Sequence, residues 1–77
     1  MPEYEYIFED VQLTDLQEAQ LAAKADVTEG VVGASSSTAG VASIIFTDEL
    51  TTGQFNRLVN YMRRVSPTAI FIRMEVV

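Results

Sequence analysis

The first segment in which apolar and polar residues alternate is residues 4–9, and a period of two is typical of a β-strand with one buried face. Tyr4, Tyr6 and Phe8 share one parity, so we expect their rings to face the core. The opposite phase would bury two glutamates without partners, which is unfavourable. Ile7 is therefore expected on the outer face of this strand.

Three further segments have the composition of strands. Residues 31–36 form a weaker predicted strand and residues 41–46 a stronger one, and the turn between them contains Gly40, which can adopt a positive φ. A hairpin is the simplest connection between the two. Residues 68–77 alternate again and predict a last strand. Its buried face is expected to carry Ile70, Ile72, Met74 and Val76, and its outer face Phe71, Arg73 and Glu75.

Two Thr-x-x-Gln sequences predict the starts of two helices, at Thr14 and at Thr51. In such a capping box the threonine hydroxyl accepts a hydrogen bond from the backbone N–H three residues on, and the glutamine side chain reaches back to the N–H of the threonine. The first helix is expected to run to about Asp26. The second is expected to end before Pro67, because the residue before a proline is disfavoured in the α conformation.

Each predicted helix has an apolar stripe with the helical period, and we expect both stripes to pack against the sheet. In the first helix, with Leu21 on another side, the stripe comprises Leu13, Leu16, Ala19, Ala23 and Val27. In the second helix it comprises Phe55, Leu58, Val59, Met62 and Val65.

The two halves of the chain, about residues 1–36 and 37–77, repeat the same order of features. In each half a strand ends in phenylalanine, an aspartate follows, and a leucine precedes the capping box. Two strand–helix–strand units with right-handed crossovers have few ways to pack. The sequence therefore predicts one α+β domain, residues 1–77: a ferredoxin-like β-α-β-β-α-β sandwich whose antiparallel four-stranded sheet has the order 4-1-3-2, with both helices on one face. The alternative is a swapped or barrel-forming dimer of the same units.

On that fold the helix-free face of the sheet is expected to carry Ile7, Ile45 and Phe71 side by side. A contiguous exposed apolar patch usually marks an interface, so we expect another subunit or a partner to cover this face. Arg73 lies beside the patch, and Val77 ends an apolar last strand at the edge of the sheet, where unpaired backbone groups favour pairing with another chain. The predicted interface thus comprises Ile7, Ile45, Phe71, Arg73 and Val77.

The composition removes most kinds of site chemistry. The chain has no cysteine and no histidine, which excludes thiolates, disulfides, imidazole bases and the commonest metal ligands. We therefore predict no catalytic, cofactor-binding or metal-binding residues, and a protein that is not an enzyme. One Ser-rich turn has hydroxyl and backbone N–H groups that would contact a ligand or partner, unless it is only a flexible hairpin tip; it comprises Ser35, Ser36, Ser37 and Thr38.

The net charge of −6 is distributed unevenly. Residues 1–30 contain eight of the eleven carboxylates and one cation, Lys24, whereas the four arginines all follow. Such polarity disfavours broad contact with nucleic-acid phosphates and suits docking between unlike protein faces. No stretch approaches the length of a membrane span and no signal peptide precedes residue 4, so a cytoplasmic protein is expected.

The pattern resembles the ferredoxin-like superfold, which includes amino-acid-sensing ACT modules, acylphosphatases, RNA-recognition motifs and metallochaperones. The motifs of these families are not matched. There is no Cys-x-x-Cys, the outer face of the first strand carries glutamates and Ile7 in place of aromatic and basic residues, and residues 10–12 stand in place of an arginine-rich loop. An ACT-like module is contradicted least, although residues 10–13 lack the glycine usual in its ligand loop.

A fold of this kind does not by itself assign a function. We expect a small acidic, non-enzymatic interaction module that forms a homo-oligomer, a dimer or larger, and binds a protein partner. One alternative is a small-ligand-binding regulatory or sequestering protein with its site at a subunit interface. Another is an acidic decoy that inhibits a nucleic-acid-binding protein.

Overall fold

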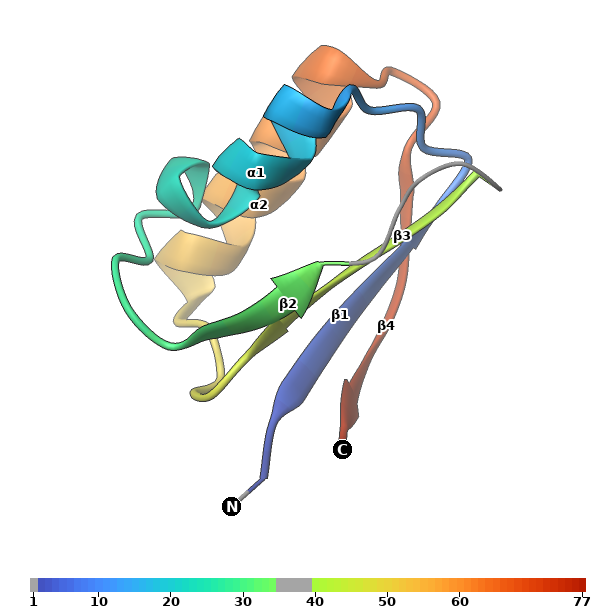
Figure 1. Ribbon diagram of the computed structural model, residues 1–77. Coiled ribbons are helices and arrows are strands. Elements are labelled where there is room, and N and C mark those ends of the chain that lie inside the picture. Colours follow the sequence, from blue (N-terminus) through green and yellow to red (C-terminus); the bar gives the residue numbers. More distant parts are fainter. Residues whose placement is uncertain (1, 35–39) are drawn as a thin grey trace.

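The computed structural model describes residues 2–34 and 40–77. Its elements are β1 (Tyr4–Glu9), α1 (Asp15–Lys24), β2 (Val31–Ala34), β3 (Val41–Phe46), α2 (Thr52–Val65) and β4 (Ile70–Val76). The strands form one four-stranded sheet in the order β2-β3-β1-β4, and each neighbouring pair is antiparallel. Both helices lie against the same face of the sheet (Figure 1). The predicted ferredoxin-like α+β fold is thus confirmed.

Both helices begin at the predicted capping boxes. The N–H of Gln17 donates to Oγ1 of Thr14 at 3.2 Å, and the N–H of Thr14 donates to Oε1 of Gln17 at 2.9 Å. At α2 the N–H of Gln54 donates to Oγ1 of Thr51 at 3.2 Å, and the N–H of Thr51 donates to Oε1 of Gln54 at 3.0 Å. These bonds satisfy backbone donors that have no partner within the helix, and so fix where each helix starts.

The buried side of α1 differs from the predicted stripe. Leu21 and Ala25 are buried and Ala22 packs against the core, whereas Leu16 is 68% exposed. The two sides of this helix are hard to distinguish in the sequence because alanines occur on both. Each side has one large apolar residue within the helix, Leu16 on the predicted side and Leu21 on the buried side. The helix also ends slightly earlier than expected, at Lys24.

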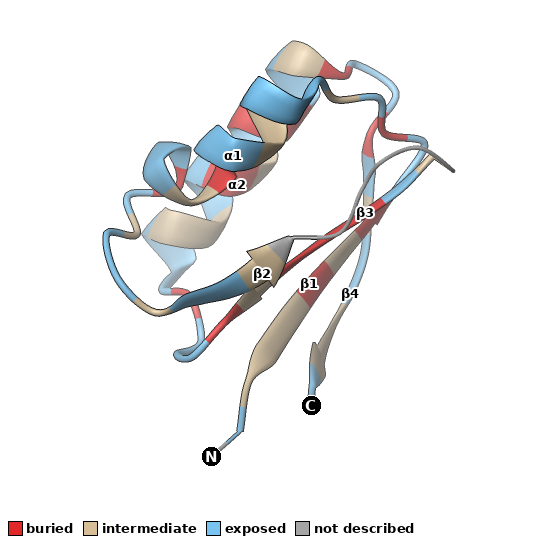
Figure 2. Cartoon of the chain, in the orientation of Figure 1, coloured by how far each residue is buried: buried red, intermediate tan, exposed pale blue. Residues whose placement is uncertain are grey.

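The core lies between the helices and the inner face of the sheet. Buried positions concentrate on the central strands β1 and β3, whereas much of β2 and β4 is exposed (Figure 2). From these two strands the buried residues facing the helices are Tyr6, Phe8, Ala42, Ile44 and Phe46. The predicted stripe of α2 packs on them: Leu58 and Met62 are buried, and Phe55, Val59 and Val65 are partly so.

Strand β4 departs from the predicted alternation because a β-bulge interrupts its pairing with β1. Ile7 pairs with Arg73, but the next residue, Phe8, pairs with Phe71, so that Ile72 is an extra residue in β4. Since side chains alternate between the two faces of a strand, one extra residue moves the residues before it, Ile70 and Phe71, to the opposite faces from those expected.

Phe71, expected on the outer face, lies in the core as a result. Its ring centroid is 5.3 Å from that of Phe8 and 4.8 Å from that of Phe55, both in edge-to-face arrangements. Conversely Ile70 and Ile72, expected to be buried, are 50% and 37% exposed. The prediction that Phe71 belongs to an outer apolar patch is therefore wrong.

Candidate functional site

The helix-free face of the sheet, which we call the open face, keeps Ile7 and Ile45 of the predicted interface. Ile7 lies between Ser43 of β3 and Arg73 of β4, and Ile45 lies diagonally from it, opposite Glu5. Both isoleucines are half-buried. They form an apolar diagonal on the two central strands, but without the aromatic ring that was expected beside them.

Further apolar residues lie at the end of the open face where Glu9 is located. Val41 and Ile70 pair with Glu9 from either side, and they are 42% and 50% exposed. The sequence places Val41 on this face, but strict alternation places Ile70 in the core. No signal in the sequence marks the changed phase of Ile70, because β3 contains a similar apolar run, Ile44-Ile45-Phe46, and pairs with β1 without a bulge.

Exposed large apolar side chains concentrate on the sheet. Among the described residues one lies on a helix, Leu16. The others lie in strands or directly after β4: Val31, Val32, Val41, Ile70, Ile72, Val76 and Val77. Most of them belong to β2 and β4, the two edge strands. The sheet, and its edges above all, is therefore the surface suited to association.

The outer edge of β4 presents backbone groups to another strand. Glu3 and Val77 exchange two backbone hydrogen bonds, of 3.0 and 2.8 Å. Because hydrogen-bonded and non-hydrogen-bonded pairs alternate in an antiparallel ladder, Glu75 bonds to β1, whereas the N–H and C=O of Met74 and Val76 point away from it. The predicted edge position of this strand, with Val77 exposed at its end, is confirmed.

Arg73 gives the open face its one cation among the described residues. Its Nε donates a hydrogen bond to Oε1 of Glu75. This bond, together with the charges of Glu75, Glu9 and Glu5, raises the pKa of Arg73 above its ordinary value, so the guanidinium stays charged at working pH. With three carboxylates around one guanidinium the open face is acidic, and it suits a partner surface that is apolar and carries cations.

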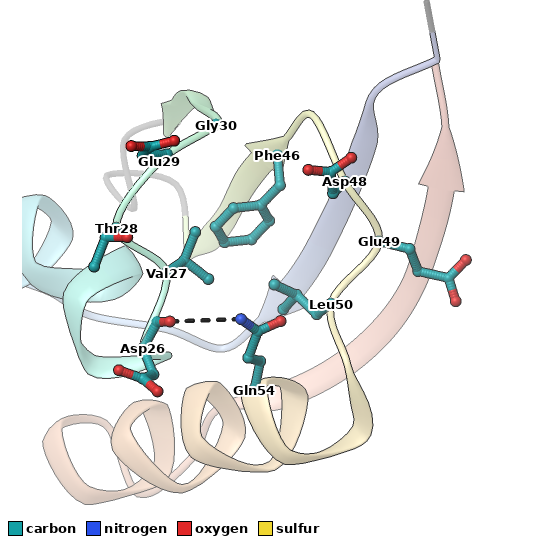
Figure 3. A pocket seen from close by; sticks show the side chains of 10 residues that line it. All are labelled: Asp26, Val27, Thr28, Glu29, Gly30, Phe46, Asp48, Glu49, Leu50 and Gln54. Atoms are coloured by element: carbon teal, nitrogen blue, oxygen red, sulfur yellow. Dashed lines mark hydrogen bonds between the residues drawn. The ribbon is translucent and has the colours of Figure 1, made fainter.

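An acidic hollow of about 210 Å³ lies where the α1–β2 loop meets the β3–α2 loop (Figure 3). Asp26, Glu29 and Asp48 line it, and Nε2 of Gln54 donates to the carbonyl oxygen of Asp26 at 3.5 Å. The Glu49 side chain points away from the others (Figure 3). Asp48 and Glu49 are exposed residues of the loop before α2, so solvent is sufficient to stabilise their charges.

A second hollow, of about 220 Å³, lies on the helices and is cationic. Its lining comprises Lys24, Arg57, Asn60, Tyr61 and Arg64. Arg57 pairs with Asp26 at 3.4 Å, and Nζ of Lys24 is 5.7 Å from the centroid of the Tyr61 ring. Lys24 and Arg64 lie in the last turns of their helices, where the dipole favours cations. The hollow is thus explained as a solvated helix surface.

The predicted ligand loop, Ser35, Ser36, Ser37 and Thr38, lies outside the described residues. Among the described residues, a hollow of about 300 Å³ is lined by Asp10, Val11, Gln12, Gly40 and Thr68. Oγ1 of Thr68 donates to the carbonyl oxygen of Asp10 at 2.8 Å. Gly40 has the positive φ expected of it, 78°. These contacts hold the loops after β1 and after α2 together, and so explain the hollow by the packing of loops.

The described residues bring no metal-ligating cluster together, since no group of three or more carboxylates is close enough to hold an ion. Burial raises the pKa of Tyr6, whose hydroxyl accepts a hydrogen bond from the N–H of Leu50 at 2.8 Å. This tyrosine is therefore fixed in the core by burial and by that hydrogen bond. In the part of the chain described, none of the helices has the length and apolarity to cross a membrane.

Fold and site together define a small ferredoxin-like α+β protein with an apolar sheet edge and a mixed apolar and acidic open face. Comparison with models of known protein families gives no match, and comparison with curated proteins finds no relative. The function has to be argued from the sheet surface itself.

Proposed function

We propose that this protein is a non-enzymatic interaction module that self-associates through the edge of β4 and binds a protein partner on its open face. The observation that carries the proposal is the concentration of exposed large apolar side chains on the sheet. Each square ångström of such surface that association removes from water contributes roughly 25 cal/mol. The helix side offers little of this kind, because Leu16 is its exposed large apolar residue among those described.

Self-association is assigned to β4 because this edge is the longer of the two and continues for four residues after the bulge. The strand has seven residues and contains no proline, whereas the opposite edge, β2, has four residues. A strand edge of this kind is a template for another strand unless something covers it. The same strand in a second copy is the simplest cover, since two identical antiparallel strands complement each other about a two-fold axis.

The open face is assigned to the protein partner. Apolar contact area is supplied there by Ile7, Ile45, Val41 and Ile70. The surrounding glutamates give the face a negative charge. A second copy is less suited to this face than to the edge, because two open faces would bring carboxylates together. A partner with a basic and apolar surface matches it in charge and in chemistry.

The first experiment compares Val76→Pro with Val76→Ala by sedimentation equilibrium. The N–H of Val76 points to the free edge, so proline there spares the ladder to β1 but blocks a strand added outside. We expect the wild type and Val76→Ala to exceed the mass of one chain, 8.5 kDa, and Val76→Pro to sediment at that mass. A wild type that stays at the mass of one chain at millimolar concentration would contradict the proposal.

The second experiment compares Ile7→Glu with Leu16→Glu. Both replace a large apolar residue by glutamate, but Ile7 lies on the open face and Leu16 on the outside of α1. We expect a partner retained by immobilised wild-type protein to be retained by Leu16→Glu and lost from Ile7→Glu, with both variants keeping the mass of the wild type. Equal retention by the two variants would remove the open face from the proposal.

A further inference from the structure

We infer that two copies of this chain pair their β4 strands antiparallel about a two-fold axis at Met74, so that Arg73 of each copy faces Glu75 of the other. The inference rests on the proposed self-association and specifies its geometry. The result is a continuous sheet of eight strands, four from each copy, with all the helices on one side.

The backbone of β4 restricts where the axis can lie. Met74 and Val76 point their N–H and C=O groups to the free edge, whereas Glu75 uses its own to bond β1. A partner strand must therefore bond to the even-numbered residues. An axis at Met74 satisfies this, because the two Met74 residues then exchange a pair of backbone hydrogen bonds across the axis.

The charges of β4 select this axis among the neighbouring ones. An axis at Arg73 would place two guanidinium groups directly opposite each other, and an axis at Glu75 would do the same with two carboxylates; like charges in such positions are destabilising. An axis at Met74 instead places Arg73 of one copy opposite Glu75 of the other. Their backbones do not hydrogen-bond to each other, and this kind of cross-strand pair is the closer one, with Cα atoms about 4.5 Å apart. Symmetry provides this favourable pair twice.

The apolar residues of β4 fit the same axis. It places Ile72 opposite Val76, again twice, and these side chains are 37% and 61% exposed in the single copy. An axis at Ile72 would fall on the bulge, and an axis at Val76 would leave only the last residues of the strand to pair. The register centred on Met74 therefore covers the exposed edge residues and pairs the charges at the same time.

The test is a charge-reversal cycle with three variants: Arg73→Glu, Glu75→Arg and the double exchange. Each single variant turns both cross-strand pairs into like-charge pairs, so we expect the dissociation constant of the dimer to rise about tenfold or more. The double exchange restores opposite charges across the axis and also within each chain, and we expect it to return to within about threefold of the wild type. Arg63→Glu on α2 is the net-charge control for Arg73→Glu, because it makes the same change of −2 outside the edge strand and should leave the constant unchanged.

Sedimentation equilibrium gives the constants, and hydrogen exchange at the Met74 amide gives a second measurement. We expect this amide to become protected as the protein concentration rises, whereas the amide of Glu75, bonded to β1, is protected throughout. If the wild type associates but the single variants match Arg63→Glu, or the double exchange fails to recover, the register is wrong while the proposed function stands. If the wild type does not associate, the proposed self-association fails, and the inference fails with it.

Discussion

Phe71 connects the edge strand β4 to the core. Its ring lies 6.5 Å from that of Tyr6 and closer to those of Phe8 and Phe55, so one aromatic cluster joins β4 to β1 and α2. The pairs of Phe71 with Phe8 and Phe55 are edge-to-face, and such pairs stabilise by about 0.5–1.5 kcal/mol beyond their buried area. The cluster anchors the first part of the edge strand, while Ile72, Arg73 and Val76 of the same strand stay exposed.

We predict that Phe71→Ala lowers the free energy of unfolding by about 3 kcal/mol, near the lower end for buried phenylalanines because this ring is only half-buried. The neighbouring Ile70→Ala removes an exposed side chain from the open face and should cost less than about 1 kcal/mol. Urea unfolding of the two variants measures the difference. Equal losses would contradict the core position of Phe71.

Tyr6 provides a prediction that depends on pH. Tyr6→Phe leaves the buried N–H of Leu50 without its acceptor and should cost about 1–2 kcal/mol at pH 7. Burial raises the pKa of Tyr6 above 10, so the folded state favours the protonated phenol. The stability that this group contributes is complete below its unfolded pKa, about 10, and is lost as the pH rises through the higher folded value.

The difference in stability between wild type and Tyr6→Phe should therefore narrow above pH 10. Urea unfolding at pH 7, 9 and 11 measures it, and the difference in tyrosinate absorbance between wild type and Tyr6→Phe gives the titration of Tyr6, because the chain has three tyrosines. A difference that stays constant across this range would show that Tyr6 titrates alike in both states.

At the scale of the elements, the capping boxes determine where both helices begin. Thr51→Ala removes the hydroxyl that accepts from the N–H of Gln54, and we predict a loss of about 1 kcal/mol. Thr52→Ala, one residue on, is the matched control, because Thr52 is the exposed first residue of α2 and makes no cap. Thermal unfolding of the two variants should separate them by several degrees. Equal melting temperatures would show that the capping box does not stabilise α2.

The order of the elements could be predicted from the sequence because its signals are local. Each capping box needs only four residues, and the alternation of β1 and β3 is uninterrupted. The side of α1 that packs could not be predicted, since alanines lie on both sides and Leu16 and Leu21 compete. The phase of β4 could not be predicted by alternation because the bulge at Ile72 exists only in its pairing with β1.

The residues of the candidate site could be predicted from the sequence wherever the bulge in β4 does not affect them. Ile7, Ile45 and Arg73 lie on the open face because uninterrupted strands or the part of β4 after the bulge carry them. Phe71 and Ile70 exchanged faces because both precede the bulge. The position of Val77 at the edge followed from the order of the strands alone, which does not depend on phase.

At the scale of the whole molecule, the cations of the helices lie apart from the apolar and acidic open face. The cations Lys24, Arg57 and Arg64 line one hollow on the helices, whereas the open face has carboxylates around Arg73. A dimer formed through β4 would keep this separation, because both copies place their helices on the same side of the joined sheet. It would present to a partner one open face of twice the width, acidic and apolar throughout.

The strand order β2-β3-β1-β4 also determines how such a chain must fold. No two strands of the same half are neighbours: β1 lies between β3 and β4, and β2 pairs with β3. Every strand pair therefore joins one half to the other, and pairs such as Tyr4 with Val76 span almost the whole chain. Such non-local pairing slows folding and leaves neither half with a sheet of its own to form first. The two halves are therefore expected to fold as one cooperative unit and not independently of each other.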